Sequence, residues 1–309
     1  MIATRDAYGE ALAKLGEEND NIVVLDADLS GSTKTSLFAK KFPERFFNMG
    51  IAEANMIGTA AGLAAAGKIP FASTFAIFAV GRAWEQVRQS VAYPKANVKI
   101  VATHSGITVG EDGGSHQSVE DIAIMRAVPN MTVIVPADGI ETALAVKAAA
   151  DFKGPVYVRL GRNKVPTIFD DTYKFEIGKG VMLRPGTDIT FIGTGLMTAQ
   201  ALVAADLLQA EGISARVIHI ATIKPLDEEI ILAAARETGA IVTAEEHSII
   251  GGLGGAVSEL LSEKCPTKLK RVGIKDRFGL SGKGDELLKY FGLLPENLVE
   301  AAKEILAEK

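Results

Sequence analysis

The stretch NIVVLDADL, residues 21–29, is an unbroken apolar run that ends in two aspartates. A run without alternating polar residues is typical of a strand that is buried on both faces, as in parallel sheets. Four similar runs follow it: PFASTF (70–75), VKIVATHSG (98–106), MTVIVPAD (131–138) and PVYVRLG (155–161). Segments of helical period, such as residues 52–66 and 139–151, alternate with these runs. This alternation predicts a doubly wound, mainly parallel α/β domain.

The same alternation returns in the second half of the chain. It lapses over residues 167–187, which carry acids, Pro185 and several glycines. It resumes with DITFIGTG (188–195), a helix near 197–211, ARVIHIATIKP (215–225), a helix near 227–237, AIVTAEEH (240–247), a helix after GGLGG (251–255), KLKRVGI (268–274) and a last helix opened by Pro295. We therefore predict two α/β domains, over residues 1–172 and 188–309, joined by a linker over residues 173–187.

Composition and charge narrow the possible functions. The chain has 309 residues, a net charge of −5 and no cluster of basic residues, which argues against a nucleic-acid surface. The single cysteine, Cys265, allows no internal disulfide, and no apolar run reaches the length of a membrane span. Asp6 and Glu10 stand where a signal peptide needs an apolar stretch. We expect a cytoplasmic protein without membrane contact.

Polar and aromatic residues close the strands of the first domain. Ligands of open α/β sheets bind beyond the carboxyl ends of the strands, so these residues are candidates for a site. They are Asp26 and Asp28, Thr74 and Phe75, Thr103 and His104, and Arg159 and Arg162.

The stretch VGEDGGSHQSVED, residues 109–121, follows one of these strand ends. Glycines 106, 110, 113 and 114 allow tight turns that would bring together His104, Glu111, Asp112 and His116. The mixture suits a metal site, an acid/base pair or a polar pocket for a hydroxylated substrate. The histidine spacing lacks the helical i, i+4 pattern and argues against zinc. Alternatively, Ser118 and Asp121 are spaced like a capping box, and the loop would only start a helix.

Two further features have both a structural and a functional interpretation. Glu53 falls in the first turn of an apolar helix within residues 46–67, where the helix dipole alone favours an acid. Apolar surroundings would also raise the cost of ionising its carboxyl group and suit it to proton exchange. Phe75 and Phe78 are either core residues or the wall of a ligand pocket. His219 is interpreted as a core histidine.

The motifs together resemble a known family. NMGIAEANMIGTAAGLAAAG (48–67), STFAIF (73–78) and residues 102–138 resemble the pyrimidine-binding domain of transketolases, and the resemblance extends through VRLGRNKVP and the second domain. Transketolases transfer a two-carbon ketol unit between sugar phosphates with thiamine diphosphate and a divalent metal. In that family, a glutamate at the position of Glu53 binds the aminopyrimidine ring and promotes its imino form.

The resemblance also implies roles for the other candidates. Phe75 and Phe78 would pack on the pyrimidine, while Asp28 and Leu29 would face the cofactor. His116 would lie near the amino group of the cofactor, and Asp112 would recognise a sugar hydroxyl. The substrate phosphate would be held by His104, Ser32 and Arg162. Gly81 departs from the family, which usually has a further aromatic residue there.

One family motif is missing from this chain. Related thiamine enzymes bind the diphosphate through Mg²⁺ held by a G-D-G motif and a later asparagine, and no G-D-G occurs here. The resemblance therefore implies the C-terminal subunit of a split transketolase with no metal ligands of its own. A separate N-terminal, diphosphate-binding subunit would complete a heterotetramer.

Other functions stay open from the sequence. The β subunit of a 2-oxo acid dehydrogenase decarboxylase component and half of a deoxyxylulose-phosphate synthase resemble the same two-domain plan. The combination EDGGSHQ with Arg162 favours sugar-phosphate recognition over the acyl transfer of the dehydrogenase subunit, whereas the synthase half, whose donor is pyruvate, stays open. A regulatory subunit without catalysis and a nucleotide-dependent oxidoreductase are further alternatives, although the glycine fingerprint expected of the oxidoreductase is missing after the first strand.

Overall fold

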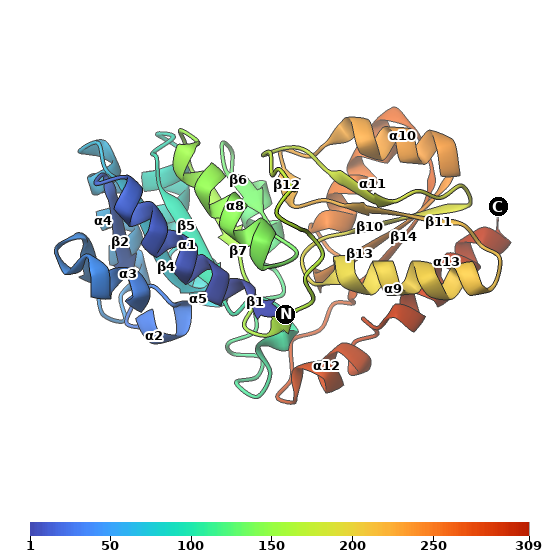
Figure 1. The fold of residues 1–309 in the computed structure, drawn as a ribbon, viewed down its shortest axis with the longest axis horizontal. Helices are drawn as coiled ribbons and strands as arrows, with labels where there is room; N and C mark the ends of the chain where they lie inside the picture. Colours follow the sequence, from blue (N-terminus) through green and yellow to red (C-terminus); the bar gives the residue numbers. More distant parts are fainter. Residues whose placement is uncertain (309) are drawn as a thin grey trace.

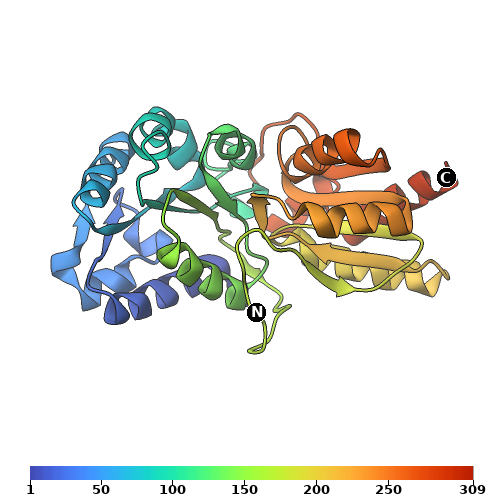
Figure 2. The same cartoon turned by 90° about the horizontal axis from the view of Figure 1, so that it is seen from above.

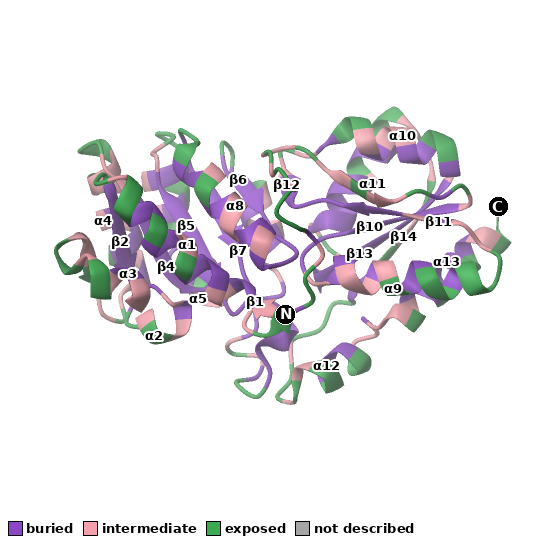
Figure 3. Cartoon of the chain, in the orientation of Figure 1, coloured by how far each residue is buried: buried purple, intermediate pink, exposed green. Residues whose placement is uncertain are grey.

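The computed structural model describes residues 1–308 as two α/β domains that lie side by side (Figure 1). Each domain has its own sheet, and Figure 2 shows helices on both faces of each sheet. The central strands form the buried interior in Figure 3, whereas the outer faces of the helices are exposed. The prediction of two doubly wound, mainly parallel domains is therefore confirmed. No helix within residues 1–308 is long and apolar enough to cross a membrane.

The first sheet has seven strands in the order β12-β6-β7-β5-β4-β2-β3. All neighbours are parallel except the edge pair of β12 and β6. The strands are β2 (Ile22–Asp26), β3 (Phe46–Asn48), β4 (Ile69–Phe75), β5 (Lys99–Thr103), β6 (Thr132–Ile134), β7 (Val156–Arg159) and β12 (Thr222–Lys224).

Two groups of helices cover the faces of this sheet. Side chains of α1 (Thr4–Glu18), α3 (Ser36–Lys41) and α8 (Gly139–Asp151) share one apolar core with the sheet. The second core is formed by α4 (Glu53–Ala65), α5 (Ala76–Gly81), the π-helical turn Val87–Ala92 and α7 (Asp121–Ala127). Short elements complete the domain: α2 (Ser30–Thr33), α6 (Trp84–Gln86), 3-10 turns at Pro43–Arg45 and Ile107–Val109, and a small ladder of β1 (Ile2–Ala3) with β8 (Lys164–Val165).

The second sheet has five strands in the order β14-β13-β10-β11-β9. These are β9 (Val181–Arg184), β10 (Ile189–Gly193), β11 (Ala215–His219), β13 (Ala240–Ser248) and β14 (Lys268–Ile274). One face packs on α9 (Met197–Ala210) and α13 (Pro295–Ala307), with α12 (Gly284–Tyr290) beside them. The opposite face packs on α10 (Glu228–Thr238) and α11 (Leu253–Lys264), whose core continues into the first domain.

Two strands depart from the predicted division of the chain. Part of the segment predicted as a linker is the strand β9, because Val181–Arg184 pairs antiparallel with β11. The strand β12 lies within the predicted second domain but extends the first sheet by pairing with β6. The two domains therefore exchange main-chain hydrogen bonds as well as side-chain contacts.

Candidate active site

The order of the first sheet brings the predicted site residues to one edge. The neighbours β7, β5, β4 and β2 are parallel, so their carboxyl ends lie in a row. Phe75 closes β4 opposite Thr103 at the end of β5, and His104 follows directly. Asp28 and Leu29 follow β2 on one side of this pair, and Arg162 follows β7 on the other.

Four rings form a cluster at this edge. The rings of Phe75 and His104 are stacked with their centroids 3.7 Å apart, and Phe75 and Phe78 are stacked at 5.7 Å. His116 meets both phenylalanines edge-on, at 6.3 Å from Phe75 and 5.5 Å from Phe78. Phe75 is buried and Phe78 is half-buried. The cluster therefore has an aromatic wall with a partly accessible face.

Glu53 begins α4 and lies beside this cluster. Its side chain is only 4% exposed, yet its Oε1 accepts a 2.8 Å hydrogen bond from Nη1 of Arg82. The Arg82 side chain is half-exposed, and its guanidinium lies over the Phe78 ring at 4.1 Å. Arg82 follows α5 directly, so the same short helix supplies Phe78 and the cation that reaches Glu53.

The environment of His104 keeps its imidazole neutral. Burial, reinforced by the positive charges of Arg5 and Arg162, lowers the pKa of His104 to about 3. Nη1 of Arg5 donates to Nε2 of His104 over 3.1 Å, so Nε2 is unprotonated. Nδ1 then carries the proton and donates to the hydroxyl of Thr103 over 2.9 Å. His104 is thus a neutral ring in a fixed tautomer.

Cationic groups gather next to His104. Arg5 also donates to the main-chain oxygen of Ser32 over 3.2 Å, and its Nε is buried without a hydrogen-bond partner within residues 1–308. Arg162 donates to the main-chain oxygen of Val109 over 2.6 Å and lies 3.5 Å from the carboxylate of Asp112. Burial and the neighbouring Arg162 lower the pKa of Arg5. Guanidinium groups of this kind favour an anion.

The turn after β2 holds three of the predicted residues. Asp26 is fully buried and accepts hydrogen bonds from the Leu29 N–H at 2.6 Å and from the hydroxyls of Thr33 and Thr35 at 2.7 and 2.8 Å. These bonds shape the short helix α2, which carries Ser32. Asp28 has a positive φ of 63° and accepts a hydrogen bond from Asn48 at 2.9 Å. Asp26 is therefore a structural residue that places its neighbours.

The glycine-rich loop folds differently from a simple helix cap. Helix α7 begins at Asp121 with Glu120 as N-cap and no side-chain cap, so the alternative of a Ser118–Asp121 capping box is wrong. Asp121 instead accepts a 2.8 Å bond from Nε of Arg159, deep in the protein. Gly110 and Gly113 have φ values of 91° and 74°, which glycine adopts most readily. These turns expose Glu111 and Asp112 and direct His116 to the ring cluster.

Two residues of the site were missed by the sequence analysis. Arg5 lies 99 residues before His104, and Arg82 lies 29 residues after Glu53, so no local spacing links either pair. Arg159, which the sequence analysis placed at a strand end, does not join the ring cluster but pairs with Asp121. His219 is a buried core residue, as expected, and contacts Glu141 at 2.7 Å and Thr198 at 2.7 Å.

Comparisons with known proteins agree with this geometry. Residues 1–167 match the family described as transketolase, pyrimidine binding domain, and residues 178–298 match the transketolase C-terminal domain. This chain belongs to the transketolase family. The resemblance found in the sequence is thereby confirmed.

Three relatives are similar over nearly the whole chain. A protein of Methanocaldococcus jannaschii described as a transketolase C-terminal section is 58% identical over 98% of this chain and 95% of its own. A 6-deoxy-6-sulfo-D-fructose transketolase subunit of a Clostridium species is 46% identical over 99% of this chain and 95% of its own. A solved structure described as a split gene transketolase, inactive β4 tetramer, is 57% identical, with a TM-score of 0.93 and 99% coverage of both chains.

The observed residues fit the pyrimidine half of thiamine diphosphate, the cofactor that the family implies. An aromatic heterocycle needs a flat apolar wall, which Phe75 and Phe78 offer, and a hydrogen-bonding carboxyl beside it, which Glu53 offers. Within residues 1–308, no three histidine, cysteine, aspartate or glutamate side chains gather as a metal site.

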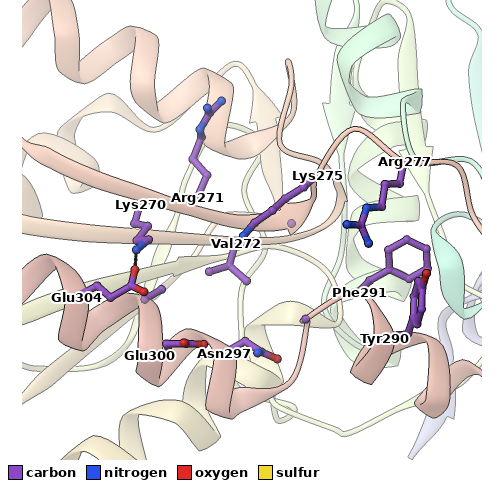
Figure 4. A pocket seen from close by; sticks show the side chains of 13 residues that line it. Lys270, Arg271, Val272, Lys275, Arg277, Tyr290, Phe291, Asn297, Glu300 and Glu304 are labelled. Atoms are coloured by element: carbon purple, nitrogen blue, oxygen red, sulfur yellow. Dashed lines mark ion pairs between the residues drawn. The ribbon is translucent and has the colours of Figure 1, made fainter.

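A separate groove lies in the C-terminal domain. Figure 4 shows Lys270 paired with Glu304 at one end of this groove and Arg277, Tyr290 and Phe291 at the other. Its volume is about 400 Å³, and its lining comes from β14, α12, α13 and the adjoining loops. This groove is therefore distinct from the ring cluster at the edge of the first sheet.

Proposed function

We propose that this chain is the C-terminal subunit of a split transketolase, which transfers a two-carbon ketol unit between sugar phosphates. The observation that carries the proposal is the buried Glu53 carboxyl next to the stacked pair Phe75 and Phe78 at the carboxyl edge of the sheet. The family implies thiamine diphosphate, which supplies a carbon nucleophile and an electron sink when bound.

The chain's own residues would bind and orient the cofactor ring. Phe75 and Phe78 present a surface for stacking, with Asp28 and Leu29 at the neighbouring strand end. Glu53 would hold a proton at the ring nitrogen that it faces, and its burial excludes competing water. His116 reaches the same wall edge-on and is held through Nδ1 by the hydroxyl of Ser115 at 3.0 Å. This contact suits a proton relay.

A second group of residues would bind the sugar phosphate. Arg162, Arg5 and the Ser32 region lie around His104, and a planar guanidinium binds phosphate oxygens in pairs. Asp112 lies beside Arg162 on the exposed loop that also carries His116, where a carboxylate can accept a bond from a sugar hydroxyl. The neutral imidazole of His104 would add no charge and would orient Arg5 toward the phosphate, because its two nitrogens bond to Arg5 and Thr103.

A partner subunit would complete the site. The chain has no G-D-G motif, and we propose that a separate N-terminal subunit holds the diphosphate and Mg²⁺ in a heterotetramer. The similar split transketolase described as an inactive β4 tetramer supports this dependence, because that assembly contains one type of chain and lacks activity.

The proposal can be tested by reconstitution. The chain would be mixed with a subunit that carries the G-D-G motif, thiamine diphosphate and Mg²⁺, and assayed with xylulose 5-phosphate plus ribose 5-phosphate. A parallel assay would use pyruvate as donor. Ketol transfer from the sugar phosphate is the expected result. Turnover of pyruvate alone would instead favour a deoxyxylulose-phosphate synthase half or an oxo acid dehydrogenase subunit.

The identity of the anionic group on the substrate, phosphate or sulfonate, needs its own test. The relative described as a 6-deoxy-6-sulfo-D-fructose transketolase subunit acts on a sugar with a sulfonate in place of a phosphate. The reconstituted pair should therefore also be assayed with that sulfo sugar. We expect the phosphate sugar to be preferred, and a preference for the sulfonate would redefine the substrate of the same site.

A further inference from the structure

The loop that carries Asp112 and His116 is held by the C-terminal domain. Glu246, on β13, is buried, and its Oε1 accepts a 2.7 Å hydrogen bond from the N–H of Thr108. One buried acid of the C-terminal domain therefore binds the first turn of the loop.

The backbone of the loop approaches Glu246 so closely at Gly106 that no side chain fits between them. Gly106 has a φ of 75°, and a Cβ at that residue would lie 2.3 Å from the carboxyl carbon of Glu246. Nη2 of Arg159 donates to the main-chain oxygens of Ser118 at 3.3 Å and Glu246 at 3.0 Å. This guanidinium fixes the end of the loop and the strand of Glu246 relative to each other.

Gln117 forms a second connection between the loop and the C-terminal domain. Its buried Nε2 donates to the main-chain oxygens of Ile107 at 3.0 Å, Gly110 at 3.2 Å and Leu280 at 2.8 Å. The first two bonds close the loop on itself, and the third ties it to the segment between β14 and α12. A Cβ on Gly114 would lie 2.7 Å from the Gly279 oxygen, so the two segments are in direct contact.

We propose that Glu246 and Gln117 are positioning residues, which hold residues 106–117 so that Asp112 faces the substrate and His116 keeps its edge contact with Phe75 and Phe78. The functional part of this inference rests on the proposed function. It gives the C-terminal domain a defined task in the active site, although its side chains do not reach the ring cluster through these contacts. A buried carboxylate and a buried amide that bind main-chain groups define one loop conformation, whereas apolar packing would allow several.

The test uses variants that remove each connection and a matched control. Glu246→Ala removes the acceptor, and Glu246→Gln restores an oxygen for the Thr108 N–H. Gln117→Glu keeps the shape of the side chain but replaces the donor with an oxygen that repels three carbonyls. Glu245→Gln is the control, because Glu245 is equally buried on the same strand and binds the Leu253 and Gly254 N–H groups of α11 instead.

Hydrogen exchange of the isolated chain tests the positioning itself. We expect faster exchange over residues 106–117 in Glu246→Ala and Gln117→Glu, with unchanged exchange over α4 and β4. Glu245→Gln should leave the loop protected. Unchanged loop exchange in both variants, or a loss of protection spread evenly over both domains, would overturn the inference.

Kinetics of the reconstituted pair test the consequence for the substrate. Glu246→Ala and Gln117→Glu should raise KM for the sugar phosphate about tenfold, equivalent to about 1.4 kcal/mol. The affinity for thiamine diphosphate should change less than about twofold, and Glu246→Gln should recover part of the loss. Equal losses in KM and cofactor affinity would contradict a positioning role. If the wild-type pair transfers no ketol unit, the proposed function fails, and the exchange experiment still decides the positioning.

Discussion

Glu53 and Arg82 form an ion pair across the mouth of the ring cluster. The carboxyl group is buried and the guanidinium is half-exposed, and the same guanidinium covers the face of Phe78. A ring that stacks on Phe78 and binds Glu53 must displace Arg82 from both contacts. The arginine can move outward without losing a buried environment, because half of its side chain already meets solvent.

The first prediction concerns Glu53 itself. Glu53→Gln keeps the size and one acceptor of the side chain but removes its ability to exchange a proton. Turnover of the reconstituted pair should fall about a hundredfold or more, the usual contribution of a proton-transfer group. The mass of the assembly, measured by light scattering, should not change. Unchanged turnover would instead favour a regulatory subunit.

The second prediction concerns Arg82. Ion pairs with a half-exposed partner contribute about 0.2–1 kcal/mol, so Arg82→Ala frees Glu53 at little cost. Thiamine diphosphate should bind the reconstituted pair about two- to fivefold more tightly, as measured by calorimetry. Arg88→Ala is a suitable control, because Arg88 is exposed and its guanidinium donates to the neighbouring Gln89 rather than to the ring cluster. Weaker binding in Arg82→Ala would show that Arg82 helps to hold the cofactor.

The sequence allowed us to predict several residues of the site, but not the residues with which they form contacts. Glu53, Phe75, Phe78, His104 and His116 were identified from motifs, and the structure brings them to one strand edge. Their roles stay predictions. No sequence motif pointed to Arg5 or Arg82. Each guanidinium reaches the site through a contact between residues far apart in the sequence, which only the folded structure creates.

Among the elements, α2 depends on one buried acid for its shape. Asp26→Ala would leave the Leu29 N–H and the hydroxyls of Thr33 and Thr35 without their acceptor. The free energy of unfolding should fall by about 1–3 kcal/mol, as for other buried donors that lose a partner. KM for the sugar phosphate should rise, because α2 carries Ser32. Urea denaturation and steady-state kinetics measure the two effects, and an unchanged midpoint would contradict the proposed support of α2.

Some helices were predicted correctly from the sequence, whereas two strands were not. The helix expected over residues 139–151 is α8, and the helix expected to open at Pro295 is α13, because periodicity and a clear first turn mark both. β9 and β12 were not predicted as they occur. VMLR becomes a strand by pairing with β11, and β12 joins a sheet from the other half of the chain. Such pairings depend on tertiary contact and leave no local pattern.

For the molecule as a whole, Arg159 connects the two domains. Its side chain is 4% exposed and pairs with Asp121, which is fully buried, while it also donates to the main chain of Glu246. Arg159→Met would leave the Asp121 charge buried and unpaired, and should lower the free energy of unfolding by about 3–5 kcal/mol.

A double variant controls for the lost charge. Arg159→Met combined with Asp121→Asn removes both charges, so its loss should be smaller than that of Arg159→Met alone. Urea unfolding can be followed by the fluorescence of Trp84, the single tryptophan. A loss in the double variant equal to the sum of the single losses would show that the pair does not couple.

The proposed function depends on assembly with a second subunit, and this dependence can be measured directly. Thiamine diphosphate binding and ketol transfer should be measured for this chain alone and with an equimolar diphosphate-binding subunit and Mg²⁺. We predict no tight binding and no transfer for the chain alone, and both for the pair, at the mass of two copies of each subunit. Robust ketol transfer by the chain alone would contradict a site that two polypeptides share.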